Sequence, residues 1–370
     1  MRSLIIKTVI QVVKIVMNLI YIPLKMRIKT EDKIVYLSRQ SNEKSLDMLM
    51  LEEEIARKYP QYKQVFRLKM IDKNPVSLVK YVFWLYGDMK ELAGAKIAVL
   101  DTYSIPVSCL KHKKGLRVVQ IWHALGAVKK FGWQSAGKEG GRSMDISKAM
   151  NMHKGYDCVI SPSYATAKFY SQAFRVPMDV IHQGTLPHVD MILDGTSRKK
   201  EFLECNPEMA DKEIILYLPT FRDGEADIVS KLYEAFDGDE KYALVISLHP
   251  LSRVERHEGS TAKGNFTSFD LMKIADIIIT DYSACTFEAS LLMKPLYFYI
   301  PDYVEYKKTR GLNIDMKSEM RECSFMNAEK LKDRIKNYDY NFDTLEEFQK
   351  KYVQNPKNST KNLARLIVEG

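Results

Sequence analysis

The sequence predicts an α/β protein with two doubly wound domains, each a mostly parallel sheet with helices on both faces. Three observations predict this fold. The chain has 370 residues, which suits two domains at about 150 residues each. Beyond residue 30, runs of β-branched and aromatic residues alternate with runs of helical periodicity. Two such series flank the polar stretch 194–212, which is the expected linker.

The elements follow in order along the chain. We expect a helix at 1–25, a first domain at 30–195, a second domain at 213–345, and helices at 346–370 that could pack back on the first domain. The strands expected in the first domain are 33–38, 62–69, 96–102, 117–123, 157–161 and 178–184, with helices at 46–58 and 77–92. Those expected in the second domain are 213–219, 242–249, 275–280 and 295–300, with a helix within 284–293.

Composition excludes several classes of protein. A hydrophobic fraction of 46% and a charged fraction of 28% exclude disordered and collagen-like chains. The five cysteines form no CxxC spacing, which argues against a disulfide framework or zinc module and favours a reducing compartment. No run of about 18 uninterrupted apolar residues occurs, so a plain membrane span is not expected.

The net charge of +9 is concentrated in two segments. Residues 1–30 hold six basic and no acidic residues, and residues 102–154 hold ten basic residues against two acidic ones. The rest of the chain is mildly acidic. Two local positive fields of this kind attract phosphate groups of lipids, nucleic acids or small ligands.

The first 25 residues have the pattern of an amphipathic helix. Lys7, Gln11, Lys14 and Asn18 form one narrow polar line, and apolar residues fill the remaining surface. We therefore expect a helix that lies in a membrane interface, with Lys7, Lys14, Lys25 and Arg27 among anionic headgroups. The alternative is a core helix whose lysines extend to solvent. A signal peptide fits poorly, because lysines interrupt the apolar part.

Polar clusters follow several of the expected strands, and ligands bind at the carboxyl ends of parallel strands. Trp122 and His123 end one strand and precede the turn residue Gly126. A glycine-rich, basic stretch to residue 155, which contains Lys129 and Lys130, comes next. A histidine beside such a loop indicates a reaction centre, although a lone histidine at a strand end can also be structural.

The second domain has similar clusters. Thr220 and Arg222 end one strand and could offer a hydroxyl and a guanidinium to a ligand, although Arg222 could instead pair with Asp223. His249 ends the next strand, before Pro250.

A further cluster, Asp281-Tyr282-Ser283, precedes an expected helix at 284–293. Ser283 as N-cap would direct the positive end of that helix at a diphosphate, and Arg310 could grip phosphate oxygens. Neither a GxGxxG nor a P-loop signature occurs.

The order and spacing of these clusters carry a resemblance. The series WHALG (122–126), SPS (161–163), LPTFRD (218–223), LHP (248–250), TDYSA (280–284) and RG (310–311) resembles the CDP-glycerol glycerophosphotransferase family of teichoic acid synthesis. The resemblance implies two Rossmann-like domains facing a cleft, in a fold of glycosyltransferase-B type. The sequence departs from the family pattern at Ala124, Ala284 and Glu288, and it lacks an arginine before Asp190.

The resemblance also implies roles for individual residues. Those implied to be catalytic are His123, as general base, and His249. Those implied on the side of the CDP donor are Thr220, Arg222, Asp281, Tyr282, Ser283 and Arg310. Those implied on the acceptor side or its loop are Trp122, Gly126, Lys129, Lys130, Ser161 and Ser163.

The implied activity is transfer of glycerol phosphate from CDP-glycerol to a hydroxyl of a lipid-linked acceptor of the undecaprenyl diphosphate type, with release of CMP. The short chain favours a primase-like enzyme, peripheral on the cytoplasmic face of the membrane, for which a homo-oligomer would be suitable. No metal-ligand spacing is evident, and a need for Mg²⁺ is left open.

Three alternatives remain at this stage. The donor could be CDP-ribitol, or the enzyme could transfer a sugar from a nucleotide sugar on the same fold. A non-catalytic nucleic-acid binder is disfavoured, because aromatic and basic residues do not interleave in the basic loop.

Overall fold

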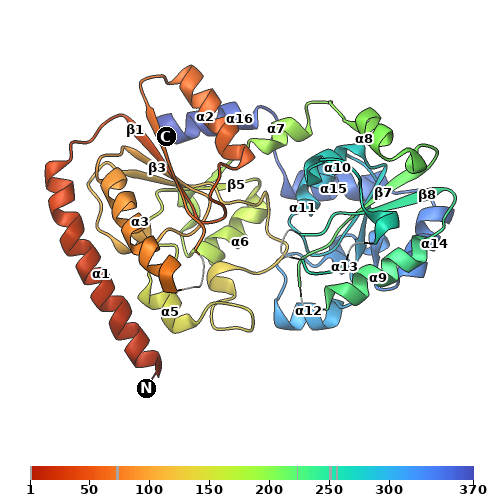
Figure 1. Cartoon of the computed structure of the whole chain (residues 1–370), viewed down its shortest axis with the longest axis horizontal. Coiled ribbons are helices and arrows are strands. Elements are labelled where there is room, and N and C mark those ends of the chain that lie inside the picture. The colour runs from red at the N-terminus through yellow and green to blue at the C-terminus, as the bar shows by residue number, and fades with distance from the viewer. Residues whose placement is uncertain (1, 72–74, 223, 250–251, 256) are drawn as a thin grey trace. The chain divides into compact units, whose positions relative to one another are not determined.

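Two parallel β-sheets organise the chain, and each belongs to its own structural unit (Figure 1). The computed structural model describes residues 2–71, 75–222, 224–249, 252–255 and 257–370, so Asp223 and Pro250 lie outside the described residues. Unit 1 comprises residues 1–124, 130–190 and 355–370, and unit 2 comprises residues 125–129 and 191–354. The prediction of an α/β protein with two parallel sheets is confirmed.

Unit 1 contains a six-stranded sheet in the order β2-β1-β3-β4-β5-β6. Its strands are β1 (Lys33–Ser38), β2 (Lys63–Leu68), β3 (Ile97–Leu100), β4 (Arg117–Gln120), β5 (Cys158–Ser161) and β6 (Ile181–Gln183). Its helices are α1 (Arg2–Arg27), α2 (Leu46–Lys58), α3 (Pro75–Ala93), α4 (Ile105–Cys109), α5 (Met144–Ala149), α6 (Tyr164–Phe174) and α16 (Ser359–Glu369). Helix α7 (His188–Ile192) carries the chain into unit 2.

Unit 2 contains a five-stranded sheet in the order β11-β10-β9-β7-β8. Its strands are β7 (Glu213–Leu218), β8 (Tyr242–Ile246), β9 (Ile277–Thr280), β10 (Leu296–Tyr299) and β11 (Ser324–Phe325). Its helices are α8 (Lys199–Cys205), α9 (Glu225–Phe236), α10 (Ser268–Ile274), α11 (Cys285–Leu291), α12 (Tyr303–Thr309), α13 (Met316–Glu319), α14 (Ala328–Asn337) and α15 (Phe342–Tyr352).

Several expected elements differ from those in the structure. Strand β4 ends at Gln120 rather than 123, because Trp122 has a φ of 62°, which no strand accommodates. The expected linker 194–212 is folded, since it contains α8 and a further helical turn at Pro207–Met209. The helix after β9 begins at Cys285 with Ala284 at its N-cap, so Ser283 is not the cap.

The C-terminal helices divide between the two units. Helix α15 packs on α11 in unit 2, whereas α16 packs on α2 in unit 1. Leu363 and Ile367 of α16 join the buried core that also contains Met48 of α2. Arg117 of β4 donates to the carbonyls of Leu366 and Ile367 at 2.6 and 2.7 Å, which satisfies exposed carbonyls at the end of α16.

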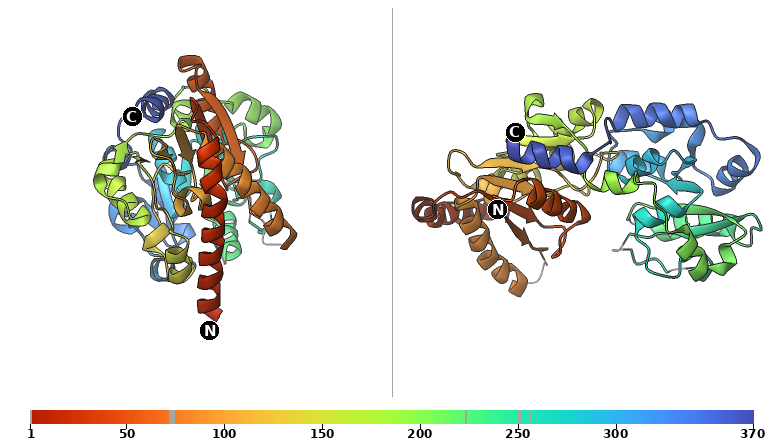
Figure 2. Two further views of the ribbon diagram at one scale, coloured as in Figure 1. Left: turned by 90° about the vertical axis from the view of Figure 1, so that its left-hand side faces the viewer. Right: turned by 90° about the horizontal axis from the view of Figure 1, so that it is seen from above.

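Helix α1 lies along unit 1 beside α3 (Figures 1 and 2). Lys7 and Lys14 of its polar line bond to the rest of unit 1, whereas Gln11 is exposed. Lys7 pairs with Asp145 at 2.9 Å, and Lys14 donates to the carbonyl of Ala149 at 2.8 Å. Lys25 donates to the carbonyl of Lys111. These three ammonium groups thus bond to other parts of unit 1. Contact of Lys7, Lys14, Lys25 and Arg27 with lipid headgroups stays a prediction.

The outward side of α1 is apolar. Val12, Leu19 and Met26 are 53%, 63% and 81% exposed. Met17 and Tyr21 are the buried anchors on the inward side, and Tyr21 Oη lies 2.9 Å from Nδ1 of His112. Within the described residues, 6–27 form a helix long and apolar enough to cross a membrane, with a mean hydropathy of 1.6.

Candidate functional site

His123 lies at the carboxyl edge of the unit 1 sheet, just beyond β4. Its Nδ1 is 2.8 Å from the backbone carbonyl oxygen of Asp101, which follows β3. A carbonyl can only accept, so Nδ1 carries the proton and Nε2 of the neutral ring keeps a free electron pair. Desolvation lowers the pKa of His123, and the carbonyl of Asp101 opposes this effect. The residue keeps access to solvent at this edge, and its lowered pKa leaves the ring neutral near pH 7 and able to accept a proton.

An aromatic cluster holds this histidine in place. The ring of Trp122 lies on that of His123, with centroids 4.1 Å apart, and stacks on Phe131 at 4.9 Å. Phe174 and His153 meet the same indole edge to face. The left-handed backbone of Trp122 turns the next side chain out of the strand line, so the strain at Trp122 orients His123.

The two serines of the SPS motif have internal partners. Ser161 Oγ donates to the carbonyl of Ser163 at 3.0 Å, and both serines are buried. Ser163 is the N-cap of α6, where its Oγ accepts from the N–H of Thr166 at 3.1 Å. Their hydroxyls therefore cap and brace the start of α6. Their predicted place on the acceptor side stays a prediction.

A buried hub at the carboxyl edge of the unit 2 sheet is centred on Asp281. Its carboxylate accepts from the N–H of Thr220 at 2.9 Å, from Thr220 Oγ1 at 2.7 Å and from the guanidinium of Arg222. Arg222 also lies 2.8 Å from a carboxylate oxygen of Asp302. Asp281 is completely buried, and Thr220 and Arg222 are nearly so. Thr220 and Arg222 thus give their polar groups to the hub in this structure, and their contact with the donor stays a prediction.

Tyr282 extends this hub. Its Oη donates to Asp302 at 3.1 Å, and its ring stacks on that of Tyr306 with centroids 3.9 Å apart. The guanidinium carbon of Arg222 lies 5.4 and 5.6 Å from the centroids of these two rings. The loops after β7, β9 and β10 are thus fixed to one another.

Ser283, His249 and Arg310 are the predicted residues of unit 2 that reach its surface. Ser283 is half-buried, and its Oγ accepts from the N–H of Cys285 at 3.4 Å. His249 is exposed beyond β8 and stacks on Phe221, with centroids 5.7 Å apart. Arg310 is exposed at the C-cap of α12, directly before Gly311, whose φ is 71°.

The segment 125–129 belongs to unit 2, although it immediately follows the His123 loop. Its Lys129 forms an antiparallel bridge with Leu312, and Asn313 donates to the carbonyls of Val128 and Lys129 at 2.8 and 3.1 Å. Gly126 packs flat on the ring of Phe287, where an added Cβ would lie 2.3 Å from a ring carbon. The glycine is therefore needed for close approach, not for a turn.

Lys129 shares the electrostatic environment of the unit 2 hub. Desolvation lowers its pKa, Asp281 and Cys285 oppose this effect, and Arg222 and Arg310 reinforce it. Lys129, expected on the acceptor side, thus lies with the residues expected to hold the donor. Lys130 is half-buried in unit 1. Over the ranges that the structure describes, no group of three or more His, Cys, Asp or Glu side chains could hold a metal ion.

Two residues of these sites were not singled out in the sequence. Asp101 follows β3 and fixes the tautomer of His123, and Asp302 follows β10 and pairs with Arg222. Both occupy the carboxyl ends of parallel strands, so the rule that located the other clusters could have found them.

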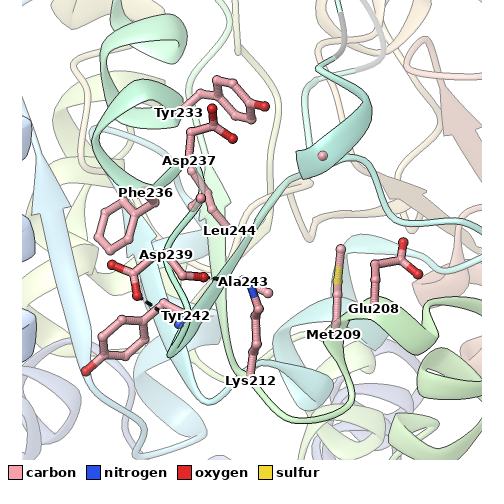
Figure 3. Close-up of a pocket in the computed structure, with 12 residues that line it drawn as sticks. Glu208, Met209, Lys212, Tyr233, Phe236, Asp237, Asp239, Tyr242, Ala243 and Leu244 are labelled. Carbon is pink, nitrogen blue, oxygen red and sulfur yellow. Dashed lines mark hydrogen bonds between the residues drawn. The ribbon is translucent and has the colours of Figure 1, made fainter.

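A cavity of about 150 Å³ lies at the opposite, amino edge of the unit 2 sheet, where β8 begins (Figure 3). Tyr233, Phe236 and Tyr242 line it, and Lys212 Nζ donates to the carbonyl of Asp239 at 2.6 Å. It contains none of the predicted site residues.

Comparisons with known proteins show the family of this chain. The family model for CDP-Glycerol:Poly(glycerophosphate) glycerophosphotransferase matches residues 20–369. A teichoic acid ribitol-phosphate primase of Bacillus spizizenii is 30% identical over 300 residues, covering 75% of each chain. A teichoic acid glycerol-phosphate primase of Bacillus subtilis is 28% identical over 312 residues, covering 80% of this chain and 77% of the relative.

A solved structure shares the fold. The wall teichoic acid polymerase TagF superposes with a TM-score of 0.71 at 21% identity, covering 98% of this chain and 96% of that chain. The family model spans both units and every predicted motif. This chain therefore belongs to the CDP-glycerol:poly(glycerophosphate) glycerophosphotransferase family.

Proposed function

We propose that this protein transfers glycerol phosphate from CDP-glycerol to a hydroxyl of a lipid-linked acceptor, in the manner of a teichoic acid primase. The observation that carries the proposal is the fixed tautomer of His123, whose free Nε2 faces away from the Asp101 carbonyl. The family and the named relatives, which are primases and polymerases of teichoic acid, support the reaction class.

The reaction needs a base and a set of cations. His123 Nε2 takes the proton of the acceptor hydroxyl as its oxygen attacks the β-phosphorus of CDP-glycerol. The bond from that phosphorus to the bridging oxygen breaks, and CMP leaves with the electron pair. Arg310, His249 and Ser283 contact the phosphates, and Lys129 adds positive charge beside them. Thr220, Arg222, Asp281 and Tyr282 position the loops that carry these groups.

The test is a product analysis. Purified protein is incubated with a lipid-linked disaccharide and one of three donors, CDP-glycerol, CDP-ribitol or a nucleotide sugar, and the products are weighed by mass spectrometry. We expect addition of one glycerol phosphate and release of CMP, with His123→Ala slower by about 10²–10⁴. A sugar adduct with release of a nucleoside diphosphate, or full turnover by His123→Ala, would contradict the proposal.

Ribitol phosphate is the second candidate for the transferred group. The relative with 30% identity is a ribitol-phosphate primase, whereas the one with 28% identity uses glycerol phosphate by name. The same incubation decides between them, since the two adducts differ in mass by C₂H₄O₂, that is, two CH₂O units.

We also propose that α1 places the enzyme on the cytoplasmic face of the membrane as a peripheral protein. Lysines at both ends and the middle of α1 bond to other parts of unit 1, which supports a helix that lies on the folded unit. Its outward apolar side would enter the interface, where each fully buried side chain contributes about 1.5–3 kcal/mol.

Liposome flotation tests this placement. Val12→Ser with Leu19→Ser should release the protein from vesicles that contain anionic lipid. Leu49→Ser, at a residue 49% exposed on α2, is the matched control and should leave binding unchanged. Binding that survives the double substitution would refute an anchor on this side of α1.

A further inference from the structure

A basic pocket lies at the carboxyl ends of the first three strands of unit 1, and the proposed chemistry does not use it. Ser38 ends β1 and Arg39 follows it, Arg67 lies in β2 and Lys69 follows that strand, and Thr102 follows β3. Tyr81, Trp84 and Asp88 of α3 complete the lining. Three cations converge on a small space with one carboxylate among the lining residues.

That carboxylate is already paired. Arg67 Nε donates to Asp88 Oδ1 at 2.8 Å, and its guanidinium lies on the ring of Trp84 at 4.0 Å. Gly87 makes this possible, because an added Cβ would lie 2.3 Å from Arg67 Nη2. Burial raises the pKa of Asp88 to about 7, and Arg67 opposes the rise. Asp88 therefore leaves the other cations of the pocket unneutralised.

Arg39 lines the pocket, and Arg142, which is not among the lining residues, shares the ring of Tyr103 with it. Both guanidinium groups lie 5.6 Å from the centroid of the Tyr103 ring. Within the part of the chain that the structure describes, neither forms an ion pair, and Arg39 Nε is buried without a hydrogen-bond partner. Two like charges held together in this way cost energy that a bound anion would offset.

The pocket shares its sheet edge with the proposed base. The N–H of Arg39 donates to Thr102 Oγ1 at 3.1 Å, and the preceding residue, Asp101, holds His123 through its carbonyl. An anion on Arg39 would therefore lie at the same edge of the unit 1 sheet as His123.

Helix α3 forms the outer wall of the pocket, and the side of α3 that faces away from the pocket is apolar. Helix α3 directs Tyr81, Trp84 and Asp88 inward, while Val82, Phe83 and Tyr86 are 63%, 75% and 48% exposed. Helix α3 packs on α1, whose outward side is also apolar. Cations beneath an exposed apolar helix are suited to an amphiphile with an anionic head.

We propose that this pocket binds the diphosphate group of the lipid-linked acceptor, with Arg39 and Arg142 on the phosphates and the lipid chain along α3. The inference rests on the proposed function, and it names where the acceptor is held. The enclosed space is about 10 Å³, room for one water molecule, so the phosphates lie across the mouth of the pocket.

Binding of two probes tests the proposal. Isothermal titration calorimetry compares farnesyl diphosphate with inorganic pyrophosphate on the full chain. Arg39→Ala and Arg142→Ala should each weaken farnesyl diphosphate binding by about tenfold or more. Lys154→Ala, which removes an exposed lysine of the same unit, is the matched control. Phe83→Ser should weaken binding of farnesyl diphosphate but leave that of pyrophosphate unchanged.

Each outcome has one meaning. If both arginine variants keep the wild-type affinity for farnesyl diphosphate, the proposal that the pocket binds the diphosphate is wrong. The Arg142→Ala variant will fold, because Arg142 is exposed. Equal affinity for both probes, with no effect of Phe83→Ser, overturns the lipid contact. CDP-glycerol binding, measured on the same variants, should not change. Arginine-dependent binding of farnesyl diphosphate without any use of CDP-glycerol would overturn the proposed function and leave the pocket standing.

Discussion

Replacing Asp281 by asparagine tests whether the buried hub holds the loops of unit 2. The substitution keeps the volume, and Thr220 can still donate to the amide oxygen. It removes the charge that faces Arg222 and turns an N–H donor toward that guanidinium. Breaking one side of a buried ion pair costs about 3–5 kcal/mol. Because Arg222 keeps Asp302 at 2.8 Å and the Thr220 carbonyl at 3.1 Å, we expect the lower end, about 3 kcal/mol.

The assay can be made specific for unit 2. All three tryptophans, at positions 84, 122 and 133, belong to unit 1, so tryptophan fluorescence follows unfolding of that unit. Far-UV circular dichroism follows both units. In urea, Asp281→Asn should shift the dichroism transition much more than the fluorescence transition.

An exposed pair supplies the control. Asp227 and Lys231 lie four residues apart on α9, and Asp227→Asn should cost less than about 0.5 kcal/mol. If Asp281→Asn costs no more than this control, the hub does not hold the loops and the reasoning fails. A larger shift of the fluorescence transition than of the dichroism transition would mean that the substitution destabilises unit 1 rather than unit 2.

Three further predictions concern the base, the segment at 125–129 and the first helix. Desolvation lowers the pKa of His123, so the neutral base is present at pH 7, and kcat/KM should fall with acid only below about pH 6.5; an acid limb centred above 7 would contradict this. Gly126→Ala should destabilise unit 2 by about 1–3 kcal/mol in urea, through overlap with Phe287, and Phe287→Leu in the same chain should recover part of it. Lys14→Ala should lower the melting temperature, through loss of the bond to Ala149, while vesicle flotation stays unchanged; loss of flotation would mean that Lys14 contacts lipid.

Local patterns predicted the sheet and its edges well. The run 33–38 is a strand with the predicted bounds, and 46–58 is a helix with the predicted bounds, because periodicity and capping act within a few residues. The strand-end rule also located His123 and the Asp281 cluster. These features depend on residues that are near one another along the chain, so the sequence alone is enough to predict them.

Features that depend on distant partners were not predictable. The two lysines in the polar line of α1 bond to Ala149 and Asp145, and nothing in residues 1–25 reveals those partners. Ser163 caps α6, and Thr220 donates a hydrogen bond to Asp281, which lies 61 positions further along the chain. A polar side chain at a strand end can serve a ligand or a neighbouring loop, and only the fold decides which.

The return of α16 to unit 1 has a consequence for handling the gene. A fragment that stops at residue 190 lacks α16, so the core around Met48 is open to water. A fragment from 191 onward contains α16 without the unit 1 core on which it packs. A stop codon shortly before the C-terminus would shorten α16 and so destabilise unit 1, although most of that unit is encoded at the start of the gene. Dissection of this enzyme therefore calls for circular permutants or fused termini rather than simple truncation.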